Sequence, residues 1–231
     1  HEIKNPLTPM KLSIQHLRRA FKRKQTEDGG TADADFPALF DRVTSTLIEQ
    51  IESLVRIADE FSTFARLPTR VLEPLDLNEV VEEAAQLLGG ETESRRIDLD
   101  LHDDPLPVEA DREELRRVYI NLIKNALQAL PDDGTGRVHV VTESVEVDGT
   151  TMAESRVTDT GEGIPSEVQD KIFEPNFSTK TSGTGLGLAI AKKSIDEIGG
   201  TIDYETEEGE GTTFWIRLPL VEETADGGRS S

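Results

Sequence analysis

The first five residues of the chain combine a histidine, a carboxylate and an amide: His1, Glu2 and Asn5. An imidazole titrates near neutral pH and can act as a nucleophile. An adjacent carboxylate can hold the proton on one ring nitrogen and leave the other nitrogen free to attack. In a helix, Asn5 lies one turn after His1 on the same face. The pattern fits a nucleophilic histidine and an exposed histidine at a helix N-terminus equally well, and the rest of the chain must decide.

Two asparagines in the second half of the chain could bind a cation that is itself bound to phosphate. Asn121 and Asn125 are spaced i, i+4, so a helix places both amides on one face. Amide oxygens are hard ligands that suit Mg²⁺, which prefers substrate phosphates to a full protein cage. Asparagines on the solvated face of a helix are also common, so the pair alone does not establish such a site.

A glycine-rich loop follows, with Asp159 ahead of Gly161 and Gly163. Closely spaced glycines let a backbone approach a ligand without Cβ clashes. Asp159 could accept a hydrogen bond from an exocyclic amine of a base. An ordinary Asp/Gly turn explains the same residues when the loop is considered by itself.

A second glycine cluster, Gly183-Thr184-Gly185-Leu186-Gly187, opens a stretch with helical periodicity. Backbone N–H groups and the helix dipole at such an N-terminus suit phosphate. The spacing is neither the dinucleotide fingerprint nor a Walker A loop, which would end in Lys-Ser/Thr. We interpret residues 172–180, between the two clusters, as a mobile lid with Phe173 and Phe177 as anchors. Lys180 would supply positive charge to a triphosphate.

Two heptad series of apolar residues must position the histidine. In the register of the first series His1 falls at b and Asn5 at f, both pointing away from the seam, which favours function over packing. The second series runs over 40–64 with Gln50 as its polar member. We predict that residues 1–66 form a helical hairpin that dimerises into a four-helix bundle. The first series comprises Ile3, Leu7, Met10, Ile14, Leu17 and Phe21.

The periodicity changes after this hairpin, and we place a domain boundary there. Residues 67–76 are predicted to be a linker, because the first of them precede a proline that disfavours helix. Residues 77–220 are predicted to form a second domain. The charged tail over 221–231, rich in Gly and Ser, is predicted to be disordered.

The second domain mixes helical and alternating patterns. Asp148-Gly149 between two alternating stretches is a hairpin signal, and Asn78 and Asp111 precede helical stretches as N-cap residues. Interspersed helices and hairpins predict an α+β sandwich. The expected helices are 78–89, 111–130, 166–173 and 186–198, and the expected strands are 97–101, 106–110, 137–147, 152–158, 201–206 and 212–218.

The composition restricts the kinds of partner. A net charge of −21, from 46 acidic and 25 basic residues, argues against non-specific nucleic-acid binding. The charge fits an ordinary acidic surface, and it would also fit a salty cytoplasm that screens self-repulsion. The absence of cysteine excludes disulfides and thiolate metal sites, and no apolar run reaches the roughly 20 residues of a membrane span. Without an initiator methionine, we expect the chain to be part of a longer protein.

In this order, the motifs strongly resemble those of the sensor histidine kinases of two-component systems. That family implies a phosphotransfer hairpin followed by an α/β sandwich ATP-binding domain of the Bergerat, or GHKL, type. The opening nine residues and the stretch 61–68 are most similar to the nitrogen-regulation branch, of NtrY type. The resembling segments are His1–Pro9 for the H box, Asn121–Ala126 for the N box, Asp159–Gly163 for the first G box, Phe173–Phe177 for the F box and Gly183–Gly187 for the second G box.

The resemblance implies a role for each matching residue. His1 would be the phospho-accepting nucleophile, Glu2 the base that orients it, and Asn5 a residue that positions water when the partner is dephosphorylated. Asn125 would ligate Mg²⁺, and Asp159 would accept from the adenine amine. The other residues implied in ATP binding are Asn121, Lys124, Gly161, Gly163, Ile164, Phe173, Lys180, Gly183, Thr184, Gly185, Leu186, Gly187 and Thr212.

The family also implies a reaction and its partners. ATP would phosphorylate His1 within a homodimer, and the phosphohistidine would donate to an aspartate of a response regulator, with phosphatase activity as a further capacity. The chain would be the cytoplasmic portion of a membrane-anchored protein. One alternative is a nucleotide-binding phosphatase or scaffold with poor autokinase activity. We expect this alternative to be favoured because the helix begins at His1. Another is an ATPase of the chaperone or mismatch-repair kind, which lacks an HExxN hairpin.

Overall fold

In the computed structural model the chain divides into two compact units. One comprises residues 1–68 with 179–184, and the other residues 69–178 with 185–231. None of the helices formed by the described residues is long and apolar enough to cross a membrane. The residues that the structure describes are 11–12, 14–15, 18–19, 40–42, 44–49, 51, 54–55, 71–88, 96–131, 133–175, 177 and 185–221.

The described residues of the first unit are helical. Arg18 donates from Nε to Asp41 at 3.0 Å and from Nη1 to Ser45 at 3.3 Å. Asp41 and Ser45 are one helical turn apart, so a single guanidinium contacts one face of the second helical stretch. Leu47 and Leu54 remain 46% and 49% exposed on that stretch. The dimeric four-helix bundle stays a prediction, and His1, Glu2 and Asn5 lie outside the described residues.

The second unit alternates strands and helices, as predicted. Its elements are β1 (Glu73–Asp76), α3 (Leu77–Leu88), β2 (Ile97–Asp100), β3 (Pro107–Ala110), α4 (Arg112–Ala129), β4 (Val138–Val147), β5 (Thr150–Asp159), the 3₁₀ helix η2 (Ser166–Lys171), α5 (Gly187–Glu197), β6 (Thr201–Glu207) and β7 (Gly211–Pro219).

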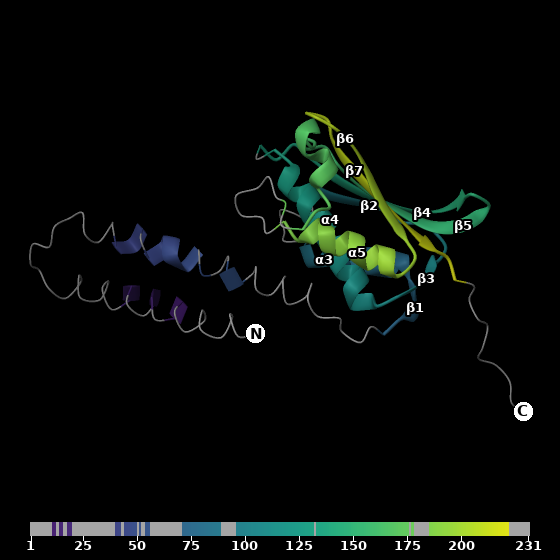
Figure 1. Ribbon diagram of the computed structural model, residues 1–231, viewed down its shortest axis with the longest axis horizontal. Coiled ribbons are helices and arrows are strands. Elements are labelled where there is room, and N and C mark those ends of the chain that lie inside the picture. The colour runs from purple at the N-terminus through teal and green to yellow at the C-terminus, as the bar shows by residue number, and fades with distance from the viewer. Residues whose placement is uncertain are drawn as a thin grey trace, which may run out of the picture. The chain divides into compact units, whose positions relative to one another are not determined.

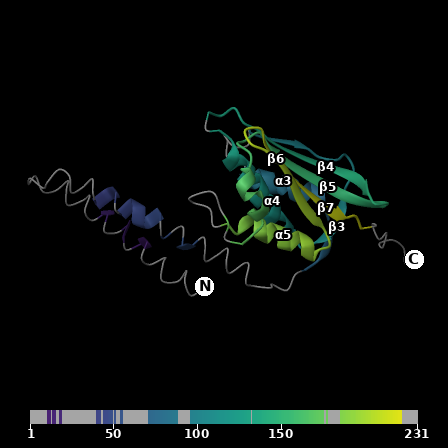
Figure 2. The ribbon, with the colours of Figure 1, turned by 45° about the horizontal axis from the view of Figure 1, so that its top comes forward.

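A five-stranded sheet forms one layer of this unit. Its strand order is β2-β4-β5-β7-β6, with β2 parallel to β4 and all other neighbours antiparallel. Helices α3, α4 and α5 lie together on one face of the sheet (Figure 1 and Figure 2), and α4 packs against both α3 and α5. Strands β1 and β3 pair separately. The unit is therefore an α/β sandwich, which confirms the predicted fold of this part.

Local sequence signals account for the best-defined junctions. Asp148 and Gly149 both have positive φ, at 51° and 78°, and form the two-residue turn between β4 and β5. Asp111 caps α4 by accepting a hydrogen bond from the backbone N–H of Glu114 at 3.1 Å. Both features were expected from residue type and position alone.

The helices and the inner face of the sheet enclose a continuous hydrophobic core. Strand β7 shows why: alternate residues point inward, and Phe214, Ile216 and Leu218 are all buried. Helix α4 contributes the opposite wall through one apolar stripe. Its buried members are Leu115, Val118, Tyr119, Leu122, Ile123 and Ala126.

The start of the second unit differs from the expectation. Residues 73–76, expected within the linker, form β1, because this segment pairs with β3 and buries Leu75. The cap of α3 is Asp76 rather than Asn78. Its Oδ1 accepts from the backbone N–H of Asn78 at 3.0 Å and of Leu106 at 2.9 Å. A capping side chain that also binds a distant loop holds the helix start in place.

The end of the second unit also extends further than expected. Val221, placed in the predicted tail, donates its backbone N–H to Pro107 at 2.9 Å, and Leu220 bridges Val108. The C-terminal segment therefore stays attached to β3 through residue 221. The remainder of the predicted tail, residues 222–231, lies outside the described residues.

Candidate nucleotide-binding site

Helix α4 presents the two asparagines toward the start of α5. Asn121 is half-buried, and its Nδ2 donates to the carbonyl of Gly187, the first residue of α5, at 3.5 Å. Asn125 is one turn further on the same face and is also half-buried, whereas Lys124 is exposed. Asn121 is thus brought beside a helix N-terminus, with Asn125 one turn further along α4.

Asp159 ends strand β5 inside the protein, with only 4% of its surface exposed. Its Oδ1 accepts a hydrogen bond from the backbone N–H of Gly161 at 2.9 Å. Its partner across the β5–β7 ladder is Thr212, which is 5% exposed. A buried carboxylate needs donors around it, so this position is suited to bind an amine.

The loop after Asp159 runs closer to its neighbours than a side chain would allow. A Cβ on Gly161 would lie 2.5 Å from the carbonyl oxygen of Ala129, at the end of α4. Gly163 has a φ of 70°, and a Cβ there would lie 2.2 Å from the carbonyl oxygen of Glu207. Glu162, between them, donates its N–H to Ala129 at 3.3 Å. The glycines therefore permit the loop to pass between α4 and the end of β6.

A threonine on β6 joins this loop to the sheet. The Oγ1 of Thr206 accepts from the backbone N–H of Ile164 at 2.8 Å. The same oxygen lies 3.1 Å from the carbonyl oxygen of Gly211 and 3.0 Å from Oγ1 of Thr212. We did not predict Thr206 from the sequence. The alternation of β6 could have indicated it. Thr206 follows half-buried Tyr204 by two residues, so the strand places this polar residue on the inner face of the sheet.

Phe173 packs against the sheet rather than standing alone. Its ring lies edge-on to Tyr204 and Phe214, with centroids 5.9 Å and 6.4 Å away. The ammonium of Lys192 lies 5.9 Å from the ring centroid, within the range of a cation–π contact. The start of the predicted lid is therefore anchored through an aromatic cluster, and Ile172 beside it is buried.

The start of α5 has the form expected for an anion-binding helix terminus. Gly185 has a φ of 68°, and Leu186 is buried with 3% exposure. Gly187 begins the helix, and the first helical hydrogen bond runs from Ile190 N–H to the carbonyl of Leu186 at 2.9 Å. The N–H groups of the first turn have no partner within a helix, and the dipole places partial positive charge there.

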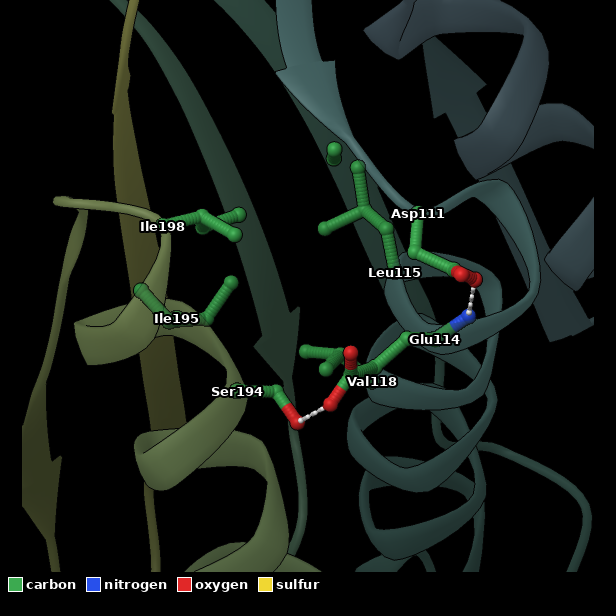
Figure 3. A pocket seen from close by; sticks show the side chains of 8 residues that line it. Asp111, Glu114, Leu115, Val118, Ser194, Ile195 and Ile198 are labelled. Atoms are coloured by element: carbon green, nitrogen blue, oxygen red, sulfur yellow. Dashed lines mark hydrogen bonds between the residues drawn. The ribbon is translucent and has the colours of Figure 1, made fainter. Parts of the chain in front are cut away.

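The far ends of α4 and α5 are joined by a polar contact beside a small cavity. Ser194 donates its hydroxyl to the carboxylate of Glu114 at 2.7 Å (Figure 3). Leu115, Val118 and Ile195 line the same cavity. This contact helps to set how α5 lies on α4, and it joins residues 80 positions apart, which sequence patterns did not reveal.

The structure places most of the predicted ATP-binding residues in one unit. Asn121, Asn125, Asp159, Gly161, Gly163, Ile164, Leu186, Gly187 and Thr212 border the ends of α4, β5 and β7 and the start of α5. Among the described residues no three His, Cys, Asp or Glu side chains converge on a metal site. The predicted residues outside the described part are His1, Glu2, Asn5, Lys180, Gly183 and Thr184.

Comparison with known proteins gives consistent matches. A family model described as "Histidine kinase-, DNA gyrase B-, and HSP90-like ATPase" matches residues 110–222. Nitrogen regulation protein NtrY of Azorhizobium caulinodans is 37% identical over 234 residues, covering 96% of this chain and 28% of that protein. Sensor histidine kinase ZraS of Escherichia coli is 34% identical over 222 residues, covering 95% of this chain and 44% of that protein.

A solved structure is also similar to this chain. The catalytic domain of histidine kinase ThkA has 35% sequence identity and a TM-score of 0.56. The match covers 65% of this chain and 96% of that domain. The chain therefore spans nearly all of a histidine kinase catalytic domain, but less than half the length of NtrY or ZraS.

Proposed function

The chain belongs to the sensor histidine kinases of two-component systems, close to NtrY, and we propose that it transfers the γ-phosphoryl group of ATP to His1. The observation that supports nucleotide binding best is buried Asp159 beside the glycine loop. On the same side of the unit, Asn121 contacts the start of α5. Helix α4 contacts both β5, which carries Asp159, and α5, so the sheet and the helices together hold the proposed base and phosphate contacts.

The site must hold a polyanion against the unfavourable field of a chain with net charge −21. Backbone N–H groups at the start of α5 provide donors that carry no counter-charge of their own. The amide oxygen of Asn125 fits Mg²⁺, whose remaining ligands would be phosphate oxygens and water. When bound, that ion would neutralise charge on the phosphates. Lys124 is exposed and Lys180 lies in the lid sequence, so both are candidate phosphate contacts.

The chemistry at His1 follows from its neighbours in the sequence. The ring nitrogen without a proton attacks the γ-phosphorus, and the bond from phosphorus to the bridging oxygen of ADP breaks. Glu2 holds the proton on the other ring nitrogen, so the attacking lone pair stays available. Phosphoryl transfer requires in-line positioning more than covalent help. The outward heptad position of His1 gives access both to a nucleotide and to a partner.

The first unit serves, in this proposal, as the dimerisation and phosphotransfer hairpin. Its two apolar heptad series supply the seam, and Gln50 sets the register as a single polar core residue. The phosphohistidine then donates to an aspartate of a response regulator receiver domain, and Asn5 positions water when that aspartate is dephosphorylated. The chain works as the cytoplasmic kinase portion of a longer, membrane-anchored sensor.

Labelling with ATP that carries a radioactive γ-phosphate tests this proposal. The unaltered chain should acquire label that is stable to base and lost in acid, as expected for phosphohistidine. His1→Gln should abolish the label, whereas His16→Gln, a histidine on the same predicted helix, should retain it. Release of free phosphate with no labelled protein, unchanged in His1→Gln, would instead support an ATPase of the chaperone kind.

A further inference from the structure

A hydrogen bond between two buried hydroxyl groups joins helix α4 to the sheet. The phenol oxygen of Tyr119, on α4, lies 2.6 Å from Oγ of Ser155, on β5. The two residues are 0% and 1% exposed, and β5 is the middle strand of the sheet. Among the buried residues of α4, which the structure describes along its whole length, Tyr119 alone carries a polar side-chain atom. A polar pair therefore interrupts an otherwise apolar contact between helix and strand.

This pair opposes movement of α4 along β5 more specifically than the apolar contacts do. Burial of apolar surface has no preferred direction, whereas a hydrogen bond weakens steeply with distance and angle. A shift of α4 by one residue along its axis is about 1.5 Å, which is enough to separate the two oxygens. Both hydroxyls would then be buried without a partner, and such groups are costly.

A second contact joins the other end of α4 to the segment that follows β5. The carbonyl oxygen of Ala129, the last residue of α4, accepts a hydrogen bond from the backbone N–H of Glu162 at 3.3 Å. Helix and strand therefore run in the same direction between the two contacts. Asn125 on α4 and Asp159 at the end of β5 both lie within this interval of the chain. The two contacts thus bracket two residues of the candidate site.

We propose that Tyr119 is a positioning residue, whose bond to Ser155 holds α4 on β5 so that Asn125 and Asp159 stand at the separation that one nucleotide needs. The inference rests on the proposed function, in which Asp159 binds the base and Asn125 binds the Mg²⁺ on the phosphates. ATP must reach both contacts at once, whereas adenosine ends at the ribose and uses the base contact only. Without the bond, fewer molecules offer both contacts at the required separation, and the apparent affinity for ATP falls by that fraction.

Equilibrium binding of adenosine and of ATP with Mg²⁺ to the whole chain tests this inference. Tyr119→Phe removes the hydroxyl and keeps the ring. The ratio of ATP affinity to adenosine affinity should fall about three- to tenfold, the range that the net contribution of one hydrogen bond allows. The affinity for adenosine itself should change little. Combining Tyr119→Phe with Ser155→Ala leaves no hydroxyl without a partner, so the stability should recover while the ratio stays low.

Thr142 offers a matched control in the same sheet. It is 3% exposed, and its hydroxyl donates to Oδ1 of Asn78, on α3, at 2.6 Å. This bond also joins a helix to a strand, but α3 carries none of the predicted ATP-binding residues. Thr142→Val should therefore lower the midpoint of urea unfolding and leave the ratio of the two affinities unchanged.

The outcomes separate positioning from a general contribution to stability. An unchanged ratio in Tyr119→Phe, or equal losses of affinity for both ligands, would overturn the inference and assign Tyr119 a structural role only. If Tyr119→Phe alone fails to fold, the double variant carries the same test, and an unchanged ratio there would overturn the inference. An equal fall of the ratio in Thr142→Val would do so too. If the unaltered chain binds neither ligand, the proposed function fails, and this inference fails with it.

Discussion

Replacing Gly163 by alanine should measure how much the close approach of the glycine loop contributes to the site. Gly163 has a φ of 70°, and Gly134, in the loop after α4, has a φ of 81°. Alanine at either position costs about 1–2 kcal/mol, because Cβ crowds the next carbonyl in left-handed backbone. At Gly134 a new Cβ meets nothing within 4 Å, whereas at Gly163 it lies 2.2 Å from the carbonyl oxygen of Glu207. The difference between the two variants therefore isolates the close approach.

The size of that difference follows from the contacts around Gly163. A carbon–oxygen contact settles at about 3.3 Å, so the loop or the end of β6 must move by about 1 Å. Two hydrogen bonds cross this junction: Ile164 to Thr206 at 2.8 Å, and Gly209 to the carbonyl of Glu162 at 2.9 Å. Each is worth about 0.5–1.5 kcal/mol. Gly163→Ala should thus cost about 1–3 kcal/mol more than Gly134→Ala, and it should weaken ATP binding.

Urea unfolding followed by tryptophan fluorescence provides the assay. Trp215 is the single tryptophan of the chain and lies in β7, so its emission reports on the second unit. The midpoint should fall slightly in Gly134→Ala and much further in Gly163→Ala, with similar slopes. Equal midpoints for the two variants would refute the argument, because the strain that they share would then account for the whole effect.

Two further perturbations test the core and the contact between α4 and α5. Burial raises the pKa of Tyr119 above its ordinary value of 10.0, so its neutral form contributes stability that is complete below pH 10 and declines as the pH rises further. In Tyr119→Phe the urea midpoint should fall less steeply as the pH rises above 10. An unchanged pH profile of the midpoint would contradict this. Ser194→Ala removes the 2.7 Å hydrogen bond to Glu114 and should cost about 1 kcal/mol, whereas exposed Ser144→Ala should change little. Equal urea midpoints for the two serine variants would argue against a role for that contact.

The features predicted correctly from the sequence are those that depend on near neighbours. Asp148 and Gly149 specify a tight turn because the residues themselves tolerate positive φ. Asp111 caps α4 because a short acidic side chain reaches the N–H groups of the next turn. The order of glycine and asparagine motifs was enough to recognise the family, since each motif is a run of consecutive residues.

The features that only the tertiary structure decided join residues far apart in the chain. Residues 73–76 become a strand because β3 is available to pair with them, and nothing within the segment itself distinguishes a strand from a linker. Thr206 meets Ile164 across 42 positions, and Ser194 meets Glu114 across 80. The motifs therefore determined which groups could bind a nucleotide, whereas strand register and helix packing determined which hydroxyls surround them. A hydrogen bond depends on distance and direction in space, and a linear pattern specifies neither for residues on different elements.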